Sequence, residues 1–205
     1  MLTLETRNQI TALVRRWVVP AMGCTEPICV ALATAKATEV LGTVPVNINV
    51  SLSANILKNA MGVGIPGTGM VGLPIAISLG TIVGKSEYGL EVIKDCTPAD
   101  VEKAKAYMAT DCINITLNNE TQEKLYVEVV CKAADGNTSR VVIEREHTNI
   151  CCVEKNGESV TSKDQTTQNP TENIAQEQQP ILTLRTVYEY ATSAPLDEIE
   201  FINEA

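Results

Sequence analysis

The spacing of apolar and polar residues predicts helices and a strand in the first part of the chain. Apolar positions recur at roughly helical spacing over residues 3–18, which predicts a first helix. A second helix is predicted over 26–41, where Thr25 can cap its start and Gly42 ends it. Strict alternation over 46–52 predicts a half-buried strand.

The rest of the chain is predicted to contain three more helices and four more strands, together with one glycine-rich segment and one polar segment. Residues 55–72 are rich in glycine and predict a loop or a glycine-lined backbone turn, and the polar stretch 157–180 predicts a linker. The remaining pattern predicts helices over 70–83, 98–110 and 181–191, and strands over 112–118, 124–133, 138–146 and 150–154.

These elements predict an α+β fold in two parts. Residues 1–84 together with 181–205 are expected to form an incomplete helical domain. Residues 86–156 are expected to form a small domain of antiparallel strands with one packed helix. The apolar residues of the 70–83 helix would then be exposed, or covered by self-association, and they are Leu73, Ile75, Ile77, Leu79 and Ile82.

Composition narrows the classes of partner. The 205 residues include 16 Lys and Arg against 25 Asp and Glu, and the net charge of −9 disfavours nucleic-acid binding. No apolar run reaches the roughly 18 residues that span a bilayer, so no membrane segment is expected. The cysteine count of seven is odd, and the N-terminus lacks a secretory signal pattern, which together predict a reduced, cytoplasmic protein.

Cys24 is the first candidate for chemistry, because it lies directly before a predicted helix. Unpaired N–H groups at a helix N-terminus carry partial positive charge and favour a thiolate over a thiol. Glu26 suits the same helix end for the same reason. The alternative interpretation is a small buried residue at a helix start. Cys29 would leave the opposite side of the helix, so the two thiols are a poor chelating pair.

The glycine-rich segment is the second candidate, and two interpretations of it stay open beside simple tight packing. It contains G-x-G-x-x-G, but about nine residues separate it from the strand and Pro66 removes an N–H, which disfavours a dinucleotide site. Exposed backbone N–H groups would instead suit a small carboxylate, such as that of an amino acid. The candidate binding residues are Asn55, Lys58, Asn59, Gly62, Gly64, Gly67, Thr68 and Gly69.

The single histidine, His147, lies with Thr148 between two predicted strands. A histidine there can serve as an acid, a base or a hydrogen-bond donor, or it can simply be solvated. The cysteines other than Cys24 are interpreted as packing residues, and no metal site is predicted among them.

Three of these segments together resemble the L-cysteine desulfidase family, which is related to the alpha chain of iron–sulfur L-serine dehydratases. They are Pro-Ala-Met-Gly-Cys-Thr-Glu-Pro at 20–27, the segment 55–69, and His-Thr-Asn-Ile at 147–150. The resemblance covers essentially the whole chain but only the N-terminal half of such proteins. It makes the helical part, residues 1–84 and 181–205, an incomplete catalytic domain.

The resemblance implies a lyase that eliminates sulfide from L-cysteine, or water from L-serine, to give pyruvate and ammonia without pyridoxal phosphate. It implies that Cys24 is the proton acceptor and that a [4Fe-4S] cluster is held by three cysteines in the missing C-terminal half. This chain alone is therefore expected to bind no cluster and to be inactive. A complementary subunit could supply the missing half.

Two other function classes remain open. A noncatalytic amino-acid-binding or regulatory domain would use the glycine-rich segment without turnover. A dinucleotide-binding module would require Gly62 to open a helix. The sequence does not decide between cysteine and serine as the substrate.

Overall fold

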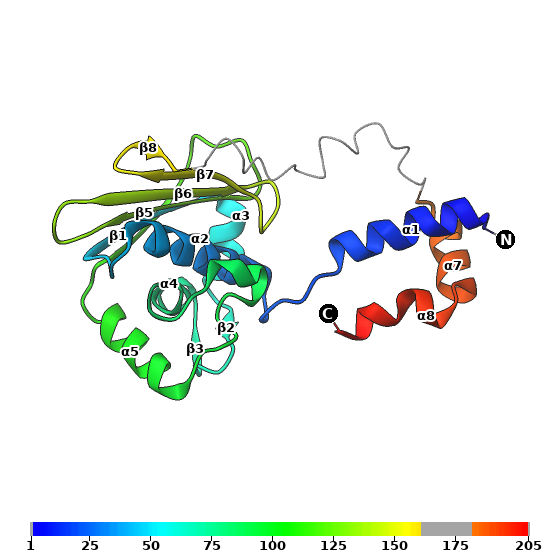
Figure 1. Cartoon of the computed structure of the whole chain (residues 1–205), viewed down its shortest axis with the longest axis horizontal. Helices are drawn as coiled ribbons and strands as arrows, with labels where there is room; N and C mark the ends of the chain where they lie inside the picture. The colour runs from blue at the N-terminus through cyan, green and yellow to red at the C-terminus, as the bar shows by residue number, and fades with distance from the viewer. Residues whose placement is uncertain (1, 161–181, 205) are drawn as a thin grey trace. The chain divides into compact units, whose positions relative to one another are not determined.

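The computed structural model describes residues 2–160 and 182–204 of the chain, and they fall into two compact units (Figure 1). One unit holds residues 21–160 and contains a six-stranded sheet. The other is helical and combines residues 2–20 with residues 182–204. The predicted α+β class is confirmed.

The sheet has the strand order β4-β1-β5-β6-β7-β8 and is mixed. β1 pairs in parallel with β4 and antiparallel with β5, and the other neighbours are antiparallel. The alternation predicted for the first strand holds, because Ile48, Val50 and Leu52 are buried. The strands are β1 (Asn47–Leu52), β4 (Ile113–Leu117), β5 (Tyr126–Lys132), β6 (Thr138–Glu144), β7 (Ile150–Lys155) and β8 (Glu158–Ser159).

Three helices form successive layers against one face of this sheet (Figure 1). α2 (Thr25–Leu41) packs on β5 and β6, α4 (Leu73–Ile82) packs on α2, and α5 (Pro98–Met108) packs on α4. α2 is buried on nearly every side, as expected for a helix between a sheet and another helix. A short 3₁₀ helix, η1 (Ser86–Glu91), also contacts α2.

The expected exposure of the 70–83 helix is wrong. Leu73, Ile75, Ile77 and Leu79 are fully buried, and Ile82 is half-buried. The reason is that α2 and α5 cover this helix within the same unit, so it presents no apolar surface to a missing half.

The structure also differs from the expected division near residue 85. β1 lies between β4 and β5 in one sheet, and one apolar core extends from Ile28 to Val153. Residues before and after 85 therefore share a core. The pairing of β1 with strands more than 60 residues away is a tertiary event that local patterning does not reveal.

The glycine-rich segment is more ordered than the predicted loop. Residues 54–60 form the short helix α3 (Ala54–Ala60), and β2 (Gly64–Ile65) and β3 (Met70–Val71) form a small hairpin. The hairpin turn spans residues 66–69, where Gly67 and Gly69 have positive φ. The expected loop is wrong over residues 55–60, which are helical, whereas the turn at 66–69 matches the predicted glycine-lined turn.

The helical unit contains α1 (Leu4–Trp17), α7 (Leu184–Ser193), α8 (Leu196–Ile199) and the 3₁₀ helix η2 (Glu200–Glu204). The predicted first and last helices are confirmed. Residues 161–180 of the predicted linker lie outside the described residues. The start of the predicted linker is a strand instead, because β8 pairs with β7.

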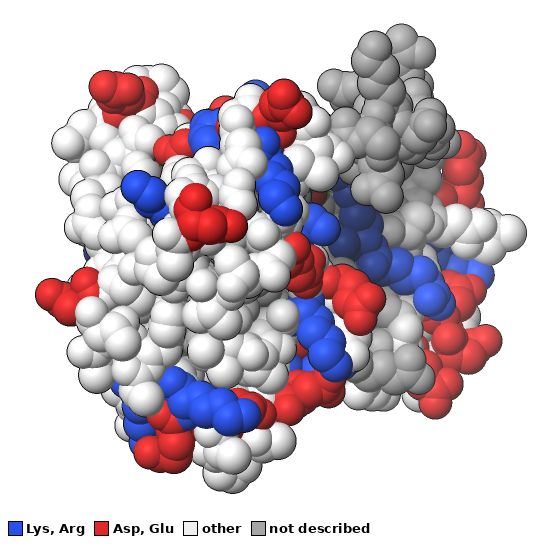
Figure 2. Space-filling model, turned by 60° about the vertical axis from the view of Figure 1, so that its left-hand side comes forward, with Lys and Arg blue, Asp and Glu red and all other residues white. Residues whose placement is uncertain are grey.

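Surface properties bear on the predicted partners. No helix in the described ranges is long and apolar enough to cross a membrane. Figure 2 shows acidic and basic side chains interspersed on one face of the molecule. The prediction that the chain has no nucleic-acid partner remains a prediction.

Candidate functional site

Cys24 occupies the N-cap position of α2, as the sequence placed it next to a helix start. Its backbone is extended, with φ −68° and ψ 131°, and the residue is half-buried. The predicted capping role of Thr25 is wrong, because Thr25 is the first residue inside the helix. The sulfur therefore lies beside the first helical turn and not deep in the aliphatic core.

Glu26 gathers the polar groups of this site. The Cys24 Sγ–H donates to Glu26 Oε2 at 2.9 Å, and the Thr25 hydroxyl donates to the same oxygen at 3.3 Å. The Asn59 side-chain amide donates to Glu26 Oε1 at 3.2 Å. One carboxylate thus connects the start of α2 with the C-terminal part of α3. Sequence reasoning assigned Glu26 only a favourable position on the helix dipole, although an acid two residues after a candidate cysteine was a usable signal.

The expected thiolate at Cys24 is wrong for the free chain. Burial raises the pKa of the Cys24 thiol above its ordinary value, and donation to the Glu26 carboxylate raises it further. Backbone N–H groups at the helix start lower the pKa, but by less. In turn, the hydrogen bond from Cys24 lowers the pKa of Glu26. At neutral pH the pair is a thiol beside an ionised carboxylate.

Replacing Glu26 with Gln should make the Cys24 thiol react faster with iodoacetamide. The change removes a negative charge that raises the thiol pKa and leaves the helix N-terminus in place. We expect the alkylation rate at pH 8 to rise about three- to tenfold, since each unit of pKa changes the thiolate fraction about tenfold. Peptide mass spectrometry measures the rate, with exposed Cys151 as the internal control. An unchanged or slower rate at Cys24 would contradict this account.

The hairpin turn lies directly against the cysteine segment. A Cβ added at Gly23 would lie 3.0 Å from Cγ of Pro66, so the Pro66 ring packs against the Gly23 backbone. The turn holds itself together through Thr68, whose buried hydroxyl donates to the Ile65 carbonyl at 2.7 Å and accepts from the Met70 N–H at 2.9 Å. Thr68 thus supports the turn, and its predicted role in binding remains a prediction.

The glycines do not have the arrangement that a dinucleotide site needs. Gly62 follows α3, Gly64 lies in β2 and Gly67 lies in the hairpin turn. Gly62 does not open a helix, and the fingerprint requires a direct strand-to-helix turn. Gly67 and Gly69 belong to the turn whose Pro66 ring contacts Gly23.

His147 lies in the turn between β6 and β7 and belongs to the same neighbourhood. Burial lowers its pKa, and the negative charge of Glu26 partly opposes this effect. The imidazole is thus within electrostatic reach of the carboxylate and is neutral at pH 7. Thr148 is exposed and approaches η1, with its methyl carbon 3.9 Å from where a Cβ on Gly89 would lie.

Two predicted binding residues are not brought to Glu26 by any described contact. Asn55 lines a separate pocket of about 310 Å³, together with the segment 117–124 that follows β4. Lys58 is exposed on α3. In α3 it is Asn59 that contacts the candidate site.

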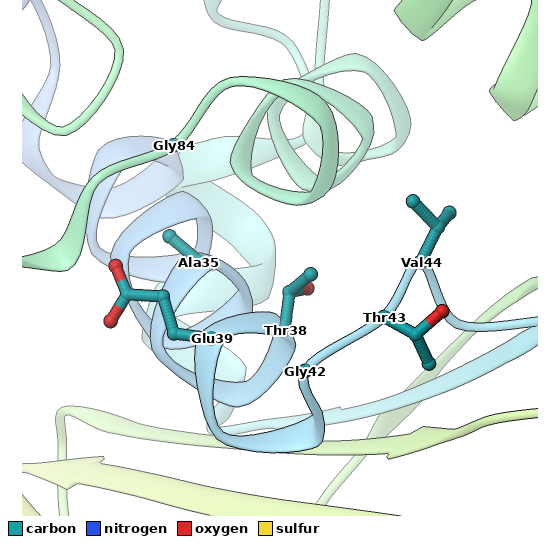
Figure 3. A pocket seen from close by; sticks show the side chains of 7 residues that line it. All are labelled: Ala35, Thr38, Glu39, Gly42, Thr43, Val44 and Gly84. Atoms are coloured by element: carbon teal, nitrogen blue, oxygen red, sulfur yellow. The ribbon is translucent and has the colours of Figure 1, made fainter.

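A further pocket of about 350 Å³ lies at the opposite end of α2. Figure 3 shows it between the side chains of Thr38 and Glu39, the segment 42–44 and Gly84. It includes no residue of the Cys24 neighbourhood. Glu39 is already engaged, since it accepts from the Ser86 N–H at 2.7 Å.

The packing interpretation holds for three of the six remaining thiols, whereas Cys151 is exposed and Cys96 and Cys152 are half-buried. Cys29, Cys112 and Cys131 are buried, and burial raises the pKa of Cys131 to about 12. Across residues 2–160 and 182–204, no group of three His, Cys, Asp or Glu side chains could hold a metal ion. The described residues therefore do not fit a [4Fe-4S] cluster.

Comparison with known proteins gives relatives along the whole chain. A UPF0597 protein of Phocaeicola vulgatus is 54% identical over 204 residues, which is 100% of this chain and 46% of that protein. UPF0597 protein BF3560 of Bacteroides fragilis is 53% identical over 99% of this chain and 46% of its own length. A UPF0597 protein of Aeromonas hydrophila is 44% identical over 94% of this chain and 43% of its own length.

No protein-family model matches the chain, and no solved structure matches it. The names of the relatives state no reaction, substrate or cofactor, so the resemblance to cysteine desulfidases remains a prediction. From end to end, the chain is a close homologue of UPF0597 proteins and spans about half of their length.

Proposed function

We propose that this chain is the proton-transfer part of a lyase that eliminates sulfide from L-cysteine, or water from L-serine, to give pyruvate and ammonia. The observation that carries the proposal is the 2.9 Å contact between Cys24 and Glu26 beside the hairpin turn. A thiol, a carboxylate and a neutral imidazole form a suitable set for removing a proton from a small amino acid. The resemblance to cysteine desulfidases supports the same reaction.

The substrate itself would convert the resting thiol into a base. Its ammonium group would bind next to the Glu26 carboxylate and offset the charge that raises the Cys24 pKa. Its carboxylate would lie against the turn that contains Gly67 and Gly69, with Asn59 as a donor. The thiol then loses its proton to water more easily, and the helix N-terminus stabilises the resulting thiolate.

The thiolate would take the proton from the substrate Cα. The electron pair of that bond forms the Cα–Cβ double bond, and the Cβ–S bond breaks with release of hydrosulfide. The aminoacrylate product tautomerises to an imine, which water hydrolyses to pyruvate and ammonia. The resemblance assigns the [4Fe-4S] cluster to the part of the protein outside this chain.

The test is turnover by a complete assembly. The chain is joined to the part of the Phocaeicola vulgatus relative that it does not match, in the order of that relative, and is reconstituted anaerobically with iron and sulfide. After removal of excess sulfide, we expect equal release of sulfide and pyruvate from L-cysteine, or pyruvate alone from L-serine. The chain without that part is the control and should give neither product. Absence of pyruvate from both substrates in the folded, reconstituted assembly would refute the lyase proposal.

A noncatalytic amino-acid-binding domain is the second candidate. The ionised Glu26 carboxylate, which already accepts three side-chain hydrogen bonds, is suited to holding an ammonium group. Calorimetric binding of L-cysteine by the assembly without product would favour this function. We also propose that the protein works in the cytoplasm, where its seven thiols would stay reduced.

A further inference from the structure

The helical unit leaves one apolar face of α7 uncovered. Leu184, Val187 and Tyr188 are spaced three and four residues apart, so they lie together on one side of the helix. Their exposed fractions are 89%, 48% and 69%. We call these three residues the α7 face. Tyr190 leaves the helix on another side, where its hydroxyl hydrogen-bonds with Thr11 of α1 at 2.9 Å.

The contacts within the unit do not form an independent apolar core. Among its described residues, the buried hydrophobic side chains are Ile10 and Tyr190. Contacts between its helices include the ion pair of Arg7 with Glu198 at 3.0 Å and the Arg15 guanidinium 4.2 Å from the centre of the Phe201 ring. The buried atoms Arg7 Nε and Glu198 Oε2 have no hydrogen-bond partner within the described part of the chain. Short helices need apolar burial for stability, so a partner that covered the described helices would stabilise this unit.

The lengths of the relatives indicate what the partner is. The Phocaeicola vulgatus relative matches the whole chain, helical unit included, and more than half of that protein lies outside the match. The buried α4 offers no surface to that part, whereas the α7 face is uncovered. The α7 face also resembles a protein interface in composition, because the ion pair of Arg185 with Glu189 lies beside its apolar residues as a polar rim.

We propose that the α7 face is the docking surface for the polypeptide segment that UPF0597 relatives carry beyond the region matched by this chain. The segment would cover Leu184, Val187 and Tyr188 with apolar side chains of its own and would stabilise the helical unit. This proposal concerns assembly and does not rest on the lyase chemistry.

Hydrogen exchange tests the proposal without any activity assay. The chain alone is compared with the chain joined to the unmatched part of the Phocaeicola vulgatus relative. Amide exchange of residues 184–193 should slow at least about tenfold in the joined protein, because docking converts a weakly held helix into a packed one. Strands β5 and β6 serve as the internal reference and should exchange equally in both proteins. Equal exchange of α7 in the two proteins would overturn the proposal.

Substitutions identify the face itself. Leu184→Asp with Tyr188→Asp, placed in the joined protein, should return the exchange of α7 to the rate seen in the chain alone. Both side chains are largely exposed in the chain alone, so the substitutions remove little packing within the described residues. Val46→Asp is the matched control, since Val46 is 54% exposed on the other unit, and it should leave α7 exchange unchanged. Retained protection in the double variant would overturn the assignment of the face.

Light scattering distinguishes two candidate partners of the α7 face: the segment carried by the relatives and a second copy of this chain. If the chain alone forms a dimer that the same double substitution dissolves, and α7 protection is already complete in that dimer, then the occupant is another copy and the proposal fails. A chain that stays monomeric, with α7 protected only in the joined protein, supports it.

Discussion

Gly80→Val should destabilise the sheet-containing unit more than any exposed substitution. Gly80 lies where α4 crosses α2, and a Cβ added there would lie 2.5 Å from the Ala31 carbonyl oxygen and 3.1 Å from Ala31 Cα. Both obstacles are backbone atoms, so no side-chain rotation relieves the clash and the two helices must separate. Overpacking costs about 1–3 kcal/mol, and we expect a loss of at least about 3 kcal/mol here because a whole helix must shift. That is a large share of the roughly 5–15 kcal/mol that stabilises a domain.

Urea denaturation followed by far-ultraviolet circular dichroism measures this effect. Fluorescence would report on the wrong unit, since the single tryptophan, Trp17, lies in α1. Gly62→Val is the matched control, because a Cβ there meets nothing within 4 Å and its φ is not positive. The control should shift the free energy of unfolding by less than about 1 kcal/mol. Equal midpoints for wild type and Gly80→Val would show that the helices do not cross as closely as described.

Cys24→Ala should abolish turnover by the assembled lyase. Under the proposed mechanism the Cys24 sulfur removes the substrate α-proton, and loss of a general base typically slows a reaction about 10²- to 10⁴-fold. We therefore expect kcat to fall at least about 100-fold, with L-cysteine binding retained through Glu26 and Asn59. Assays of released sulfide and pyruvate on the joined, reconstituted protein measure the decrease in kcat.

The control for this prediction is a second half-buried thiol outside the site. Cys96→Ala, in the segment before α5, should keep kcat within about twofold of wild type. The pH profile gives an independent readout: the Cys24 pKa is raised in the free chain, so kcat/KM should increase as pH rises above neutrality and more thiolate forms. Normal turnover by Cys24→Ala would show that the Cys24 sulfur is not the base that removes the substrate α-proton.

Local sequence patterns predicted most helices and strands, because their signals lie within a few residues of each other. The alternation at 46–52 depends on residues next to one another, and so does the start of α5, where the Thr97 side chain accepts from the Asp100 N–H. The hairpin at 64–71 was missed because its glycines and proline read as a loop, and its strands have only two residues each. A strand of two residues is too short to show the alternation of apolar and polar positions that predicts a strand.

The candidate site was predicted in part for the same reason. The position of Cys24 at a helix start follows from the adjacent residues, but its protonation does not. Glu26 and burial together outweigh the helix N-terminus, and the size of each effect depends on which groups surround the sulfur. Asn59 reaches Glu26 from 33 residues away, and the turn at Pro66 approaches Gly23 from more than 40, so neither contact is visible in a local pattern.

The sequence by itself determined the α+β composition and the helix that begins after Cys24, since these depend on short-range propensity and periodicity. Only the tertiary structure decided that β1 joins distant strands in one sheet and that α4 is buried rather than exposed. It also placed a carboxylate in direct contact with the Cys24 thiol. Those outcomes depend on which surfaces meet after the chain collapses, and the burial and charge that result set both the packing and the chemistry of the site.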